Sequence, residues 1–106
     1  MNPPVQVIQP AGILDGTQAE QFERAIDEAI TAGAQTILVD CQDLTFMDSS
    51  GLGALILALK AIRATGGSLC ICSINAQIDQ LFRLTDTHQI FQVFADRPEF
   101  ERTLSA

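Results

Sequence analysis

The chain has 106 residues, of which 47% are hydrophobic and 18% charged, and its formal net charge is −7. Such a chain is long enough for one domain with its own core, and too hydrophobic for an intrinsically disordered protein. Its six lysines and arginines are scattered, so it lacks the basic patch that nucleic acids require. The acidic surface instead favours protein partners with basic or mixed charge.

Apolar residues alternate between the spacing of strands and that of helices. Residues 68–73 are apolar on both faces, as in a central strand of a parallel sheet. Strands that alternate with helices imply parallel βαβ units with right-handed crossovers. We predict strands at 5–8, 36–40, 68–73 and 90–94. The first predicted helix covers 18–32, and the second runs from the end of a turn at 43–50 to about residue 65. Two more helices are predicted, one after Asn75 and one after Asp96. The fold class is thus α/β: a single domain with a small, mostly parallel sheet of about four strands and helices packed against it.

Several residues mark where these helices begin and end. Thr17 is placed to cap the first helix, with Glu20 three residues later completing a capping box. Gly33 follows the last apolar position of that helix, where a glycine commonly ends one. Asn75 and Asp96 are the expected caps of the third and fourth helices.

Three further features of the sequence bear on where in the cell the protein is expected. The longest nearly uncharged run, residues 49–59, is shorter than the ~20 residues that a bilayer-spanning helix needs. The first residues have neither the positive charge nor the apolar stretch of a secretory signal. Cys41, Cys70 and Cys72 are an odd set without disulfide or metal-site spacing, so we expect reduced, buried thiols. We therefore predict a cytoplasmic protein without a membrane partner.

The junction between the second strand and the second helix carries the most distinctive chemistry. A helix start presents unpaired N–H groups and the positive end of a dipole, which suit a phosphate. Ser50 directly precedes the first apolar helical position and is the better cap, which leaves Ser49 as the more exposed hydroxyl. Gly51 and Gly53 would permit a tight turn. Because one cap suffices, Ser49 is a candidate site of modification.

Other kinds of active site have little support in the sequence. A hydrolase nucleophile elbow needs glycine two residues before the serine, and Met47 stands there. His88 is the only histidine and reads as an ordinary structural one. No glycine-rich nucleotide loop is present, and Asp40, Asp43 and Asp48 are more typical of a solvated loop rim than of a Mg²⁺ site. We expect no enzymatic activity, no metal and no cofactor.

Phosphorylation of Ser49 would need no active site in this chain. A phosphoserine adds roughly −1.5 to −2 charges, and N–H groups at a helix start could hold its oxygens without rearranging the fold. A partner that packs against the neutral serine would then face a dianion beside Asp48. These residues predict a protein-binding surface that is regulated by charge.

Residues 40–53, with their Asp-Ser-Ser-Gly-Leu-Gly core, strongly resemble the STAS domain of bacterial anti-sigma factor antagonists. The resemblance extends to residues 12–15, to Gly66-Gly67 and to residues 78–85. It therefore covers most of the chain and identifies residues 1–106 as one STAS domain.

This resemblance implies a function. In that family, the serine after the motif aspartate is phosphorylated by an anti-sigma factor that is also an ATP-dependent serine kinase, and a PP2C-type phosphatase reverses the reaction. The unphosphorylated antagonist binds the anti-sigma factor and frees the sigma factor. Carried over to this chain, the phosphorylation site is Ser49, and the partner-binding residues are Asp48, Ser49, Ser50, Gly51 and Leu52.

The resemblance also leaves an alternative function and raises a question about the sheet. STAS domains occur in transporters and sensory complexes, so the alternative is a ligand-sensing module that binds a nucleotide or small anion at the helix N-terminus after Ser50.

Family members commonly begin with an additional strand that pairs with the one at residues 5–8. Little precedes Val5 here, so we expect a sheet one strand smaller, with an edge that needs protection or a partner.

Overall fold

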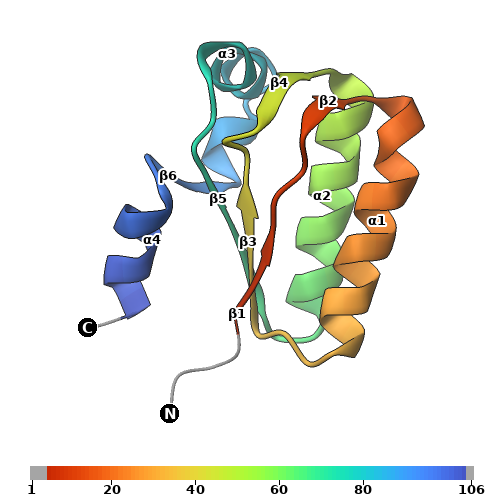
Figure 1. Ribbon diagram of the computed structural model, residues 1–106, viewed down its shortest axis with the longest axis vertical. Helices are drawn as coiled ribbons and strands as arrows, with labels where there is room; N and C mark the ends of the chain where they lie inside the picture. Colours follow the sequence, from red (N-terminus) through yellow and green to blue (C-terminus); the bar gives the residue numbers. More distant parts are fainter. Residues whose placement is uncertain (1–4, 105–106) are drawn as a thin grey trace.

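The computed structural model describes residues 5–104, which form a parallel sheet with helices on both faces (Figure 1). The main sheet has four strands in the order β1-β3-β5-β6, and a second sheet pairs β2 with β4. The strands are β1 (Val5–Ile8), β2 (Gly12–Leu14), β3 (Thr36–Asp40), β4 (Leu44–Met47), β5 (Ser68–Cys72) and β6 (Gln92–Phe94). The helices are α1 (Gly16–Thr31), α2 (Ser49–Ala64), α3 (Ala76–Leu84), the 3-10 turn η1 (Thr87–Gln89) and α4 (Arg97–Leu104).

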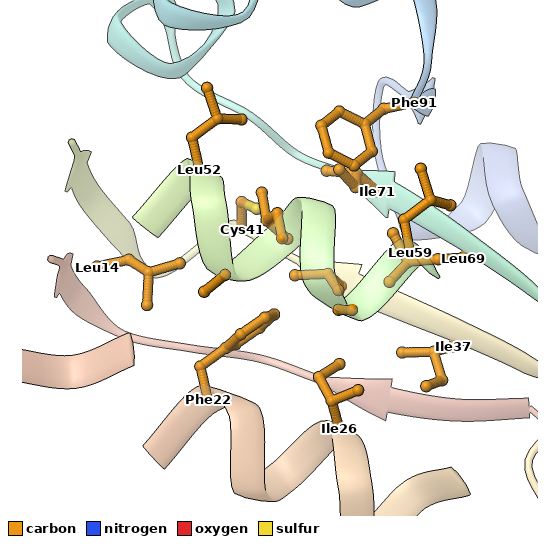
Figure 2. Close-up of a cluster of buried hydrophobic side chains, with 14 of the residues drawn as sticks. Leu14, Phe22, Ile26, Ile37, Cys41, Leu52, Leu59, Leu69, Ile71 and Phe91 are labelled. Carbon is orange, nitrogen blue, oxygen red and sulfur yellow. The ribbon is translucent and has the colours of Figure 1, made fainter. Parts of the chain in front are cut away.

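Alternate residues of the two central strands enter two separate apolar clusters. Ile37 and Val39 of β3 pack in a cluster with the inner faces of α1 and α2, which lie side by side on one face of the sheet (Figure 2). Leu38 points to the opposite face, where Phe100 of α4 covers it. Both faces of β3 and β5 are therefore buried, and the predicted central position of the third strand is confirmed.

Helix α4 is also tied to the sheet by a charged pair. The guanidinium of Arg97 donates to the Asp40 carboxylate at 2.9 Å, and only 1% of the Asp40 side chain is exposed. The Arg97 guanidinium also donates to the side-chain oxygen of Gln9 at 2.9 Å. Because Asp40 is the last residue of β3, this pair fixes α4 near the edge of the sheet where the strands end.

The predicted turn at 43–50 is wrong over residues 44–47, which form strand β4. Long-range contacts decide this, because β4 pairs in parallel with the distant strand β2, with Ile13 opposite Phe46. The apolar pattern of the segment also has a reason, since Met47 is fully buried. The fourth strand is shorter than predicted, because Ile90 and Phe91, which follow η1, form a turn and a bend instead.

The first helix begins earlier than predicted, and Thr17 is not its cap. The carboxylate of Asp15 accepts the backbone N–H groups of Thr17 and Gln18 at 3.0 and 3.3 Å. The Thr17 hydroxyl donates to the same oxygen at 2.6 Å. The caps Asn75 and Asp96 are confirmed, since their side chains accept from Ile78 and Glu99 at 2.9 Å each.

Strand β1 lies at one edge of the main sheet and pairs with β3. The additional strand of other family members would precede Val5 and so falls outside the described residues. Within residues 5–104, no helix has the length and apolar character needed to cross a bilayer.

The three cysteines should be unreactive in the native protein. All three are free and buried, with at most 5% of any residue exposed, and burial raises the pKa of the Cys41 thiol to about 12. The thiolate is the reactive form, so we expect no labelling by a disulfide reagent at pH 8 until denaturant unfolds the chain, and three labels afterwards. Rapid labelling of any thiol without denaturant would contradict this burial.

Candidate functional site

Both serines of the motif lie in the first turn of α2. The cap is Asp48, whose extended backbone precedes the helix and whose carboxylate accepts the N–H of Gly51 at 3.0 Å. The prediction that Ser50 caps this helix is therefore wrong, because the helix begins two residues earlier than the apolar pattern indicated. Capping uses the carboxylate and leaves the hydroxyls of Ser49 and Ser50 free for other contacts.

The two serines face different surroundings, although both are exposed. Ser50 lies beside the start of α1, since a Cβ built on Gly16 would be 3.7 Å from the Ser50 Oγ. Ser49 is the first residue of α2, and about 100° of helical rotation separates its side chain from that of Ser50. Ser49 is therefore the hydroxyl that points away from α1.

Gly51 and Leu52 pack the start of α2 against the interior of the domain. A Cβ on Gly51 would be 2.2 Å from the carbonyl oxygen of Leu14, which leaves no room for any side chain. The same carbonyl accepts the Asp48 N–H at 3.3 Å. Leu52 is 4% exposed and packs in the core (Figure 2). Gly51 thus serves close packing inside the helix rather than a tight turn.

Two amide side chains at the start of α3 hold the strand that leads to Ser49. The Gln77 amide accepts from the Met47 N–H at 2.8 Å and donates to the Met47 carbonyl at 2.7 Å. The Asn75 amide donates to the carbonyls of Leu44 and Thr45 at 3.3 and 3.2 Å. These bonds satisfy the edge of β4 that β2 does not cover, so α3 fixes the segment before Ser49. Sequence reasoning gave Asn75 a capping role alone and missed Gln77.

The surroundings of Ser49 are negatively charged. Asp48 precedes it, and Asp15 directly follows Leu14, whose carbonyl binds the Asp48 N–H. The hydrogen bond from the Thr17 hydroxyl holds the pKa of the Asp15 carboxyl below its usual value. The Asp15 carboxylate therefore stays charged near neutral pH. Asp15 and Asp48 each lie at the positive end of a helix.

The aspartates that were considered as possible metal ligands each have a different structural partner. The Asp43 carboxylate accepts from the Gln9 amide at 2.9 Å, while Asp40 pairs with Arg97 and Asp48 caps α2. Within residues 5–104, no group of three potential metal ligands occurs. His88 lies in η1, with its Nδ1 3.4 Å from the Phe82 carbonyl.

This fold and motif can be compared with known proteins. The profile of the STAS domain family matches residues 1–100. The chain therefore belongs to the STAS domain family. An anti-sigma F factor antagonist from Paenibacillus polymyxa is 29% identical over 91 residues, which are 85% of this chain and 78% of that protein.

Solved structures share the fold. An anti-sigma factor antagonist from Mycobacterium paratuberculosis superposes with a TM-score of 0.84 at 18% identity, covering 96% of this chain and 86% of the other. The phosphorylated form of the Bacillus cell fate determinant SpoIIAA gives a TM-score of 0.72 at 22% identity, covering 97% and 94% of the two chains.

Replacing Asp48 tests which residue caps α2. Asp48→Ala removes the acceptor for the Gly51 N–H, and we expect it to cost about 1 kcal/mol of unfolding free energy in urea titrations. Asp48→Asn keeps an acceptor and should cost less. Ser50→Ala is the control and should stay within about 0.5 kcal/mol of the native chain. A larger loss for Ser50→Ala than for Asp48→Ala would restore Ser50 as the cap.

Replacing Gly51 tests the close contact with Leu14. Gly51→Ala places a methyl group against a backbone carbonyl, so α2 or β2 must shift, and we expect a loss of about 1–3 kcal/mol or more. The loss would occur although alanine is the better helix former. The same urea titration measures it, and unchanged or higher stability would show that α2 does not approach Leu14 this closely.

Proposed function

We propose that this chain is an anti-sigma factor antagonist, a cytoplasmic protein-interaction switch regulated by phosphorylation at Ser49. The observation that carries the proposal is the placement of Ser49. Its hydroxyl is exposed on the first turn of α2, and Asp48 rather than the serine provides the cap. A kinase can therefore modify it without removing a bond on which the helix depends.

The charge around Ser49 explains how phosphorylation would act. Phosphate adds roughly −1.5 to −2 charges at a place where Asp48 is already negative. Since the Asp48 carboxylate occupies the Gly51 N–H, much of the new charge would face outward. A partner that fits the neutral serine would have to desolvate a dianion, so it would be released while the domain stays folded.

The proposed partners are an anti-sigma factor that acts as a serine kinase, bound when Ser49 is unphosphorylated, and a PP2C-type phosphatase that restores the serine. The names of the relative from Paenibacillus polymyxa and of the structural neighbour from Mycobacterium paratuberculosis support an anti-sigma factor as the partner. The phosphorylated form of SpoIIAA supports regulation by phosphate. In this proposal Asp48, Ser49 and Ser50 contact the partner, while the buried Gly51 and Leu52 hold the helix start in place. The chain is then a substrate and binding protein rather than an enzyme.

The alternative, a module that binds a nucleotide or small anion at the same helix start, has less support. An anion there would compete with the Asp48 carboxylate for the Gly51 N–H. It would also lie close to the negative charge of Asp15.

Substitutions of Ser49 test the switch. With a purified anti-sigma factor serine kinase and ATP, we expect phosphate incorporation to be lost in Ser49→Ala and retained in the matched control Ser50→Ala, as measured by mass spectrometry. By calorimetry, Ser49→Ala should bind the kinase as the native chain does. Ser49→Asp should bind at least tenfold more weakly, because its charge imitates part of the phosphate. Undiminished labelling of Ser49→Ala would refute the site.

A further inference from the structure

Gly53 is half-buried and lies on the side of α2 that faces away from the core, one turn after Ser49. A helix has about 3.6 residues per turn, so Ser49, Gly53 and Leu57 follow one another along a single ridge. The buried residues of α2 occupy the opposite side: Gly51, Leu52, Ala54, Leu55, Ala58, Leu59 and Ile62. Leu57 is 56% exposed, so the ridge continues from a serine through a glycine to an unburied apolar side chain.

The fold itself does not require glycine at this position. A Cβ built on Gly53 would have no neighbouring heavy atom within 4 Å, in contrast to Gly51. In an exposed helix interior, glycine lowers the folding equilibrium constant about fivefold relative to alanine. Within the described residues, no contact of Gly53 offsets this cost, and the space beside its Cα is open.

Charges beside the ridge indicate what kind of surface would fit. Helices α1 and α2 lie next to each other (Figure 1), and a shallow hollow of about 220 Å³ runs between them. Its lining combines Leu57 and alanines of α2 with Glu23 and Asp27 of α1. A complementary protein surface would present an apolar side chain flanked by lysine or arginine.

We infer that the surface formed by Gly53, Leu57, Glu23 and Asp27 is the docking face for the anti-sigma factor kinase that acts on Ser49, and that Gly53 lets this partner approach the α2 backbone. The inference rests on the proposed function and extends it. Because the ridge runs directly from Ser49, a kinase that holds this hydroxyl in its active site would cover Gly53 one turn later. The partner would place an apolar side chain near Leu57 and basic side chains near Glu23 and Asp27.

The decisive variant is Gly53→Ala in the full chain, for which stability and binding should change in opposite directions. We expect the thermal midpoint to rise by about 4 °C or more. Affinity for a purified anti-sigma factor kinase that phosphorylates Ser49 should fall at least tenfold in calorimetry. The control Ala64→Gly makes the reverse change at the exposed last residue of the same helix, beyond the ridge. It should lower the midpoint and leave affinity unchanged.

Two further variants test the rest of the face. Leu57→Ala should weaken binding several-fold, whereas Leu84→Ala, which truncates a leucine that is 76% exposed on α3, should not. The double change Glu23→Lys and Asp27→Lys should slow association and reduce its dependence on salt.

The outcomes separate this inference from the proposed function. If Gly53→Ala binds like the native chain while Ser49→Asp is released, the docking face is wrong and the phosphorylation switch stands. If Gly53→Ala is less stable than the native chain, the fold does need this glycine and the inference fails. If no kinase labels Ser49, the proposed function is wrong and the docking face is rejected with it.

Discussion

The close contact between the Leu14 carbonyl and the first turn of α2 is the constraint on which the site depends. This oxygen accepts the Asp48 N–H, and Gly51 passes so near that no side chain fits there. The contact joins the end of β2 to the start of α2, and β2 in turn leads directly into α1. Two helix starts from distant parts of the chain are therefore brought together at one end of the molecule, and Ser49 lies at their exposed border.

That arrangement separates the residues that maintain the fold from those available for regulation. Asp15 and Asp48 satisfy the N–H groups at the two helix starts, and the amide of Gln77 satisfies the backbone of Met47. Each of these side chains has a bond whose loss would cost stability. The hydroxyl of Ser49 has no part in this bonding of the helix start, so a change in its charge can act on a partner with little effect on the domain.

The sequence predicts the main sheet well because its signals are local. Alternation of strands and helices, the apolar faces of α1 and α2, and the caps Asn75 and Asp96 can each be recognised within a short window. Strands β2 and β4 could not be predicted in this way, because each is short and is stabilised by pairing with a distant segment. Gln77 was missed for the same reason, since a glutamine at a helix start gives no sign that it binds the backbone of β4.

The candidate site shows how a shift of two residues in the start of a helix changes the chemistry. Ser50 and Asp48 are both good caps, and local preference cannot choose between them. The choice follows from where α2 can begin once Gly51 is packed under the Leu14 carbonyl, because this contact requires Gly51 to lie already inside the first turn. With Asp48 as cap, Ser49 becomes the first helical residue and Gly53 comes one turn later on the exposed side. A packing requirement in the interior thus decides which hydroxyl a kinase can reach, and which part of α2 lies beside it.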